Sequence, residues 1–64
     1  MPPKVRECLE RASESRRIAM RTREPGSREF WREMESKWLA LADSYQHAAR
    51  TEALLHEMRR FGEP

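Results

Sequence analysis

The side chains best suited to catalysis or metal binding are two histidines and one cysteine, His47, His56 and Cys8. The histidines are nine residues apart, which on one helix places them about 180° from each other. A single helix therefore cannot direct both at one metal ion, whose ligands must converge. Asp43 and Glu52 each precede a histidine by four residues, which gives it an ordinary partner on a helix surface. We interpret both histidines as structural and predict no metal site.

A catalytic thiol would need a base and an orienting group beside it. The sequence has no glycine-rich loop and no strand-turn-helix context in which such a group could be built. Cys8 falls on the apolar side of an expected helix, where a small buried thiol is common. It is the only cysteine, so no disulfide can form within the chain, and a lone thiol fits a reducing compartment. We predict no enzyme activity, no cofactor and a cytoplasmic location.

The third group of candidate residues is a cluster of arginines around the only internal turn signal. Between residues 16 and 32, six arginines against two glutamates give a local charge of +4, although the whole chain carries only +2. Guanidinium groups bind phosphates in a bidentate manner, so one hypothesis is contact with nucleic acid. The residues that would make it are Arg17, Arg21, Arg23, Arg28 and Arg32. The plainer interpretation, which we favour, is an arginine-rich composition spread over solvated helix faces.

Two helices are expected to position these residues. Pro2 and Pro3 suit a helix start, where a missing N–H costs nothing, so we predict a first helix over about residues 4–22. One side of this helix carries a narrow stripe of apolar and small residues at helical spacing. The stripe consists of Val5, Cys8, Leu9, Ala12, Ser15, Ala19 and Met20.

Residues 23–27 are predicted to form the bend, because proline disfavours helix at the preceding residue and glycine relaxes the backbone. The sequence leaves two helix starts open: Glu24 as cap before Pro25, or Ser27 as cap before Arg28. Our predicted range for the second helix is about 28–61, ended by Gly62. It would span about 50 Å against about 30 Å for the first. About 20 Å of the second helix is left without a partner.

A short bend makes the two helices antiparallel neighbours, with large side chains opposite small ones. We predict that Trp31 faces Ala19 and that Trp38 faces Ala12. Farther from the bend, Leu41 and Ala42 should meet Cys8 and Leu9, and Tyr45 should meet Val5. The aromatic residues are therefore interpreted as core rather than as a ligand groove.

Beyond Ala49 the apolar residues change sides. Leu54, Met58 and Phe61 lie about 140° to 180° from the Tyr45 side of the helix, and Leu55 lies about 80° from it. Either a straight helix packs its end on a second chain, or a break near residues 50–52 starts a short third helix. We favour the straight helix, because no residue there forces a break.

Part of the chain resembles small uncharacterised bacterial helical-hairpin proteins. The matching segments, within about Val5 to Tyr45, are Arg6-Glu7-Cys8-Leu9-Glu10-Arg11-Ala12, Ser15-Arg16-Arg17-Ile18-Ala19, Glu24-Pro25, Phe30 to Glu35 and Trp38-Leu39-Ala40-Leu41-Ala42. The family pattern is a CRxxA helix, a DPxxR turn and an FLxMAxxWLxLA helix. This chain differs in having Ser15 for a cysteine and Glu24 for an aspartate. The resemblance implies a helical hairpin and carries no known activity.

The sequence thus predicts an all-α protein, with residues 1–64 forming one antiparallel two-helix hairpin that assembles as a helical bundle. A single core of this size is marginal, so we expect support from a second copy or another protein, most simply as a homodimer. The predicted contacts are Leu54, Leu55, Met58 and Phe61, with Ile18 as a separate contact near the bend. No apolar run is long enough to span a membrane, although the C-terminal stripe could rest on one.

Overall fold

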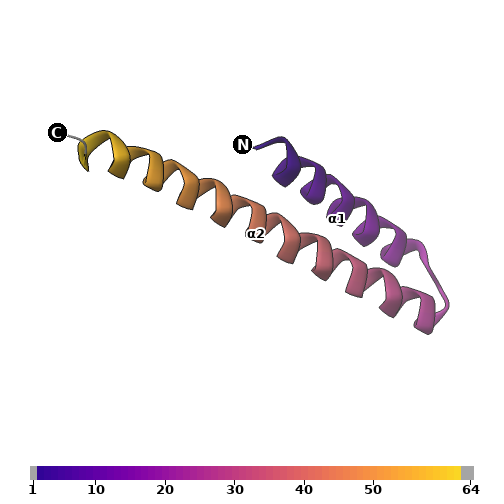
Figure 1. Ribbon diagram of the computed structural model, residues 1–64. Helices are drawn as coiled ribbons and strands as arrows, with labels where there is room; N and C mark the ends of the chain where they lie inside the picture. The colour runs from indigo at the N-terminus through magenta and orange to yellow at the C-terminus, as the bar shows by residue number, and fades with distance from the viewer. Residues whose placement is uncertain (1, 63–64) are drawn as a thin grey trace.

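The computed structural model describes residues 2–62, which form two helices joined by a short bend. Helix α1 covers Pro3–Arg21 and helix α2 covers Pro25–Gly62. The two lie side by side along α1, and the second half of α2 extends past the beginning of α1 (Figure 1). Helices of 19 and 38 residues are about 28 and 57 Å long. The expected all-helical hairpin with a longer second helix is confirmed for the described residues.

The bend is shorter than predicted, because α2 starts at Pro25 rather than near residue 28. The Glu24 carboxylate accepts hydrogen bonds from the backbone N–H groups of Gly26 (3.1 Å) and Ser27 (3.0 Å), and from the Ser27 hydroxyl. These bonds satisfy N–H groups that have no partner inside the helix. Of the two starts that the sequence left open, the one capped by Glu24 is therefore found.

The other side of the bend is held by Arg28. Its guanidinium donates to the carbonyl oxygens of Thr22 (3.1 Å, from Nε) and Arg23 (3.3 Å). The Thr22 hydroxyl in turn donates to the Ile18 carbonyl at 2.6 Å. The Ile18 carbonyl near the end of α1 and the two carbonyls that follow α1 thus have partners, and the first turn of α2 is tied to the bend.

The core between the helices is a narrow strip of small residues. Five residues of the predicted α1 stripe are buried, namely Val5, Cys8, Ala12, Ser15 and Ala19. On α2 only Ala42 is buried, and the half-buried rings of Trp38 and Tyr45 pack against the cluster of Val5, Cys8 and Ala42. The Ser15 hydroxyl donates to the Arg11 carbonyl at 2.9 Å. The expected packing of the Trp38 and Tyr45 rings on the core is therefore confirmed, and the individual facing pairs stay predictions.

Three residues of the predicted seam are exposed instead of buried: Leu9, Met20 and Leu41. A helix with one neighbour buries only the strip that faces it, and these three side chains lie at the edges of that strip. At the end of the hairpin away from the bend, the Lys4 ammonium lies 5.7 Å from the centroid of the Tyr45 ring. The first turn of α1 therefore lies beside Tyr45 of α2.

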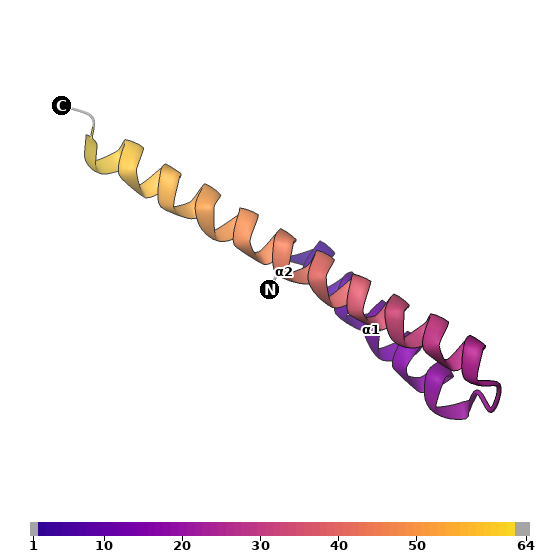
Figure 2. The same cartoon turned by 90° about the horizontal axis from the view of Figure 1, so that it is seen from below.

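Helix α2 continues without a break beyond the end of the contact with α1. The Thr51 hydroxyl donates to the His47 carbonyl at 3.0 Å, inside the helix, rather than capping a new one. Figure 2 shows the same straight course from a second direction. The expected straight helix is found, and the alternative of a short third helix is not seen in residues 2–62.

Candidate protein-interaction surface

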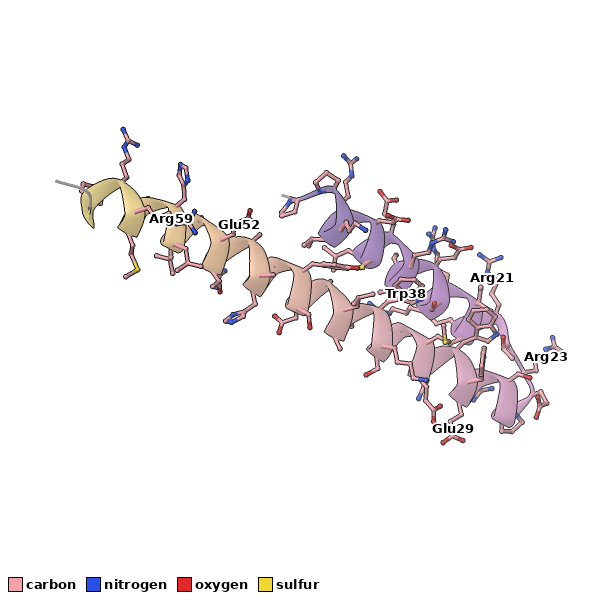
Figure 3. The ribbon with its side chains drawn as sticks, in the orientation of Figure 1. Arg21, Arg23, Glu29, Trp38, Glu52 and Arg59 are labelled. Carbon is pink, nitrogen blue, oxygen red and sulfur yellow. The ribbon has the colours of Figure 1, made fainter. Side chains whose placement is uncertain are left out.

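The most exposed apolar part of the molecule is the C-terminal end of α2. Every residue from 50 to 62 is exposed, and we call this segment the overhang. The four side chains predicted to meet a partner, Leu54, Leu55, Met58 and Phe61, are 53% to 84% exposed. In Figure 3, Glu52 and Arg59 lie on the overhang, beyond the start of α1, whereas Trp38 lies between the two helices.

The whole chain exposes more surface than a compact protein of its mass. Its accessible surface is 5829 Å² at 7.7 kDa, whereas a compact monomer of that mass exposes about 4300 Å². The radius of gyration is 17.2 Å, against about 11 Å for a compact chain of this length. The excess surface of about 1500 Å² exceeds the roughly 800 Å² that each partner buries in a typical stable interface.

Ile18, the other predicted contact, lies apart from the overhang. It is half-buried and lines an open groove of about 170 Å³ beside α1 and α2. The residues around this groove are Arg11, Glu14, Ser15, Ile18, Trp31 and Trp38. The structure therefore brings Ile18 together with the two tryptophans and not with the four overhang residues of the same chain.

Sequence reasoning missed a second set of exposed apolar side chains within the hairpin. Phe30 and Leu39 of α2 are exposed, in addition to Leu9, Met20 and Leu41. For Leu41 alone the sequence held a signal, because Met34, Leu41, Ala48 and Leu55 recur every seven residues. That repeat places Leu41 beside the seam and in line with Leu55 of the overhang.

The charges of the overhang are mixed. Arg50, Arg59 and Arg60 accompany Glu52 and Glu57, which gives the described segment a net charge of only +1. A surface with both signs does not select a strongly charged partner. The apolar side chains are therefore its distinguishing feature.

The five arginines proposed for nucleic-acid contact are all exposed. Arg21 and Arg23 project from the bend end of the hairpin in Figure 3. Arg28 is already engaged with two backbone carbonyls. The other four guanidinium groups make none of the hydrogen bonds that hold the bend. The same segment of the sequence also contains Glu24 and Glu29.

The residues considered for metal or thiol chemistry are separated. His47 and His56 are exposed on α2, and Cys8 is a buried free thiol in the core. Within residues 2–62, no three histidine, cysteine or acidic side chains gather as a metal-binding group. Neither helix, over the same residues, is long and apolar enough to cross a membrane.

Glu24 has the one clear pKa shift among the described residues. Hydrogen bonds from the Ser27 hydroxyl, the Ser27 N–H and the Gly26 N–H stabilise the carboxylate and lower its pKa. This shift reflects helix capping, because all three donors belong to the first turn of α2. It has no connection to the overhang.

Comparisons with protein-family models, with curated proteins and with solved structures found no match. The resemblance to bacterial helical-hairpin proteins therefore stays a prediction.

Proposed function

We propose that this protein is a small self-associating interaction module, in which two antiparallel hairpins form a homodimeric four-helix bundle. The observation that carries the proposal is the overhang, in which every residue is exposed, on a chain with more accessible surface than a compact protein of its mass. Burial of apolar surface stabilises an association by about 25 cal/mol per Å² before the costs of association are subtracted. An uncovered stripe of four large apolar side chains is typical of a protein-interaction site.

A second copy is the simplest partner, because most soluble oligomers are symmetric homo-oligomers. In a bundle, the apolar side of one overhang would find the exposed apolar side chains of another hairpin. This arrangement explains why the hairpin as well as the overhang carries uncovered leucine, methionine and phenylalanine side chains.

Sedimentation equilibrium tests the proposal directly. We expect twice the chain mass at micromolar concentration for the wild type, and the single-chain mass for a Leu54→Asp, Met58→Asp double variant. The matched control is Ala53→Asp, His56→Asp, which makes the same charge change on exposed positions of the other side of the overhang. This control should still dimerise. A wild type that is folded and monomeric at these concentrations contradicts the proposal.

A second candidate function is nucleic-acid binding through the arginine-rich bend, favoured by the exposure of Arg17, Arg21, Arg23 and Arg32. Binding of this kind weakens steeply as salt rises, because phosphate contacts release counterions. Arg21→Ala should weaken binding of a mixed-sequence duplex at low salt, whereas Arg50→Ala, on the overhang, should not. No measurable binding at low salt removes this candidate.

A further inference from the structure

One row of side chains on α2 runs from the part packed on α1 into the overhang. Met34, Leu41, Ala48 and Leu55 are spaced by seven residues, so they stay on one side of the helix with a drift of about 20° per repeat. Met34 is half-buried, whereas Leu41 and Leu55 are 40% and 53% exposed. The exposed flank of the hairpin and the overhang therefore share a continuous surface.

Two more exposed residues extend this row at its ends. Phe30 lies four residues before Met34, and Met58 lies three residues after Leu55, which are the spacings of neighbours on a helix surface. We call the set the heptad row: Phe30, Met34, Leu41, Ala48, Leu55 and Met58. Alternating steps of three and four residues are the pattern by which two helices pack along each other. Lys37, Ser44 and Thr51 occupy the remaining positions, so the row is only partly apolar.

Two exposed leucines of the heptad row lie symmetrically about Ala48. Leu41 and Leu55 are each seven residues from it. We propose, on the premise of the self-association argued above, that the partner is a second copy whose α2 crosses this α2 antiparallel at Ala48. Leu41 of each copy then packs against Leu55 of the other. The small alanine at the crossing lets the two helices approach closely.

In this register each overhang covers the hairpin of the other copy. Met58 is ten residues after Ala48 and Trp38 is ten residues before it, so the Met58 side chain of one copy lies level with Trp38 of the other. Trp38 and Ile18 line the open groove beside the core, which has room for a side chain. A methionine thioether against an aromatic ring is a favourable contact.

The principal alternative for two copies is overhang against overhang, centred near Leu54. That arrangement would leave Phe30 and Leu41 of both hairpins exposed. The crossing at Ala48 covers Leu41 of each hairpin together with Leu55 of each overhang. The α2 helix of the other copy ends at Gly62, level with Met34, so Phe30 is not covered.

Disulfide cross-linking distinguishes the two arrangements. Cys8 is the only native cysteine and is buried, so Cys8→Ala gives a background without thiols. In that background we expect Ala48→Cys to form a covalent dimer within the first minutes of mild oxidation. An equimolar mixture of Leu41→Cys and Leu55→Cys should yield a mixed 41–55 dimer. Gln46→Cys, on the opposite side of the helix, is the control and should cross-link at least tenfold more slowly.

Each outcome has a separate meaning. If sedimentation gives a dimer but Leu55→Cys links to itself and Ala48→Cys does not, the crossing at Ala48 is wrong and self-association stands. Equal rates for Ala48→Cys and Gln46→Cys in a sedimentation-proven dimer also overturn the register. A wild type that sediments as a monomer overturns both proposals.

Discussion

The two halves of α2 share one continuous helix but differ in what stabilises them. In the first half, Trp38 and Tyr45 pack on the small residues of α1, and Ala42 is buried. In the overhang all residues are exposed. An isolated helix of about 13 residues is marginal in water, so packing rather than propensity decides its stability. The first half is therefore stabilised by α1, whereas in the proposed dimer the second half would be stabilised by the other copy.

The largest expected effect comes from removing a ring in the packed half. Trp38→Ala deletes an aromatic side chain that packs against the Val5, Cys8 and Ala42 cluster. Truncating a fully buried aromatic side chain lowers the free energy of unfolding by about 3–5 kcal/mol. For this half-buried ring we expect a loss of about 2–3 kcal/mol. Urea unfolding followed by circular dichroism at one low protein concentration measures it.

Leu54→Ala is the matched control for Trp38→Ala, since Leu54 is exposed on the overhang. At the same low concentration Leu54→Ala should lower the free energy of unfolding by less than about 0.5 kcal/mol, as is usual for surface substitutions. If both variants lost the same free energy of unfolding, the two halves of α2 would be equally stabilised by α1.

The second prediction concerns the amide protection of the overhang. Amide hydrogens of residues 50–62 should exchange rapidly at low concentration and become protected as the concentration rises, because association orders the segment. The Leu54→Asp, Met58→Asp variant should lose this concentration dependence while the amides of α1 keep their protection. Hydrogen exchange with mass spectrometry resolves the two regions. Protection of the overhang that is independent of concentration would contradict the comparison.

Local features of the fold could be predicted from the sequence, because they depend on neighbours in the chain. The inner stripe from Val5 to Ala19 and the straight course through Thr51 follow from helical spacing and from the lack of a breaking residue. The start of α2 could not be decided, because Glu24 and Ser27 both carry a side-chain oxygen that can accept hydrogen bonds from backbone N–H groups. Only the structure shows that the Glu24 carboxylate accepts them.

Side-chain burial across the hairpin was harder to predict. Leu9 and Leu41 satisfy the helical period, but their burial depends on how the two helices are rotated about their axes. The set of exposed apolar side chains was predicted only in part for the same reason. The overhang residues were evident from the unequal helix lengths, while the exposed flank with Phe30 needed the observed rotation of α2.

The smallest expected effect lies at the bend, far from the overhang. Because hydrogen bonds in the folded state lower the pKa of Glu24, the cap contributes stability above the ordinary glutamate pKa of about 4.3. That contribution is lost as the pH falls through the lowered folded-state pKa. Glu24→Gln should therefore lower the thermal midpoint slightly at neutral pH, and its difference from the wild type should shrink as the pH falls below the ordinary glutamate pKa. Glu29→Gln, exposed one turn later, is the control. A Glu24→Gln difference that is constant from neutral to acid pH would mean that the carboxylate charge does not stabilise the start of α2.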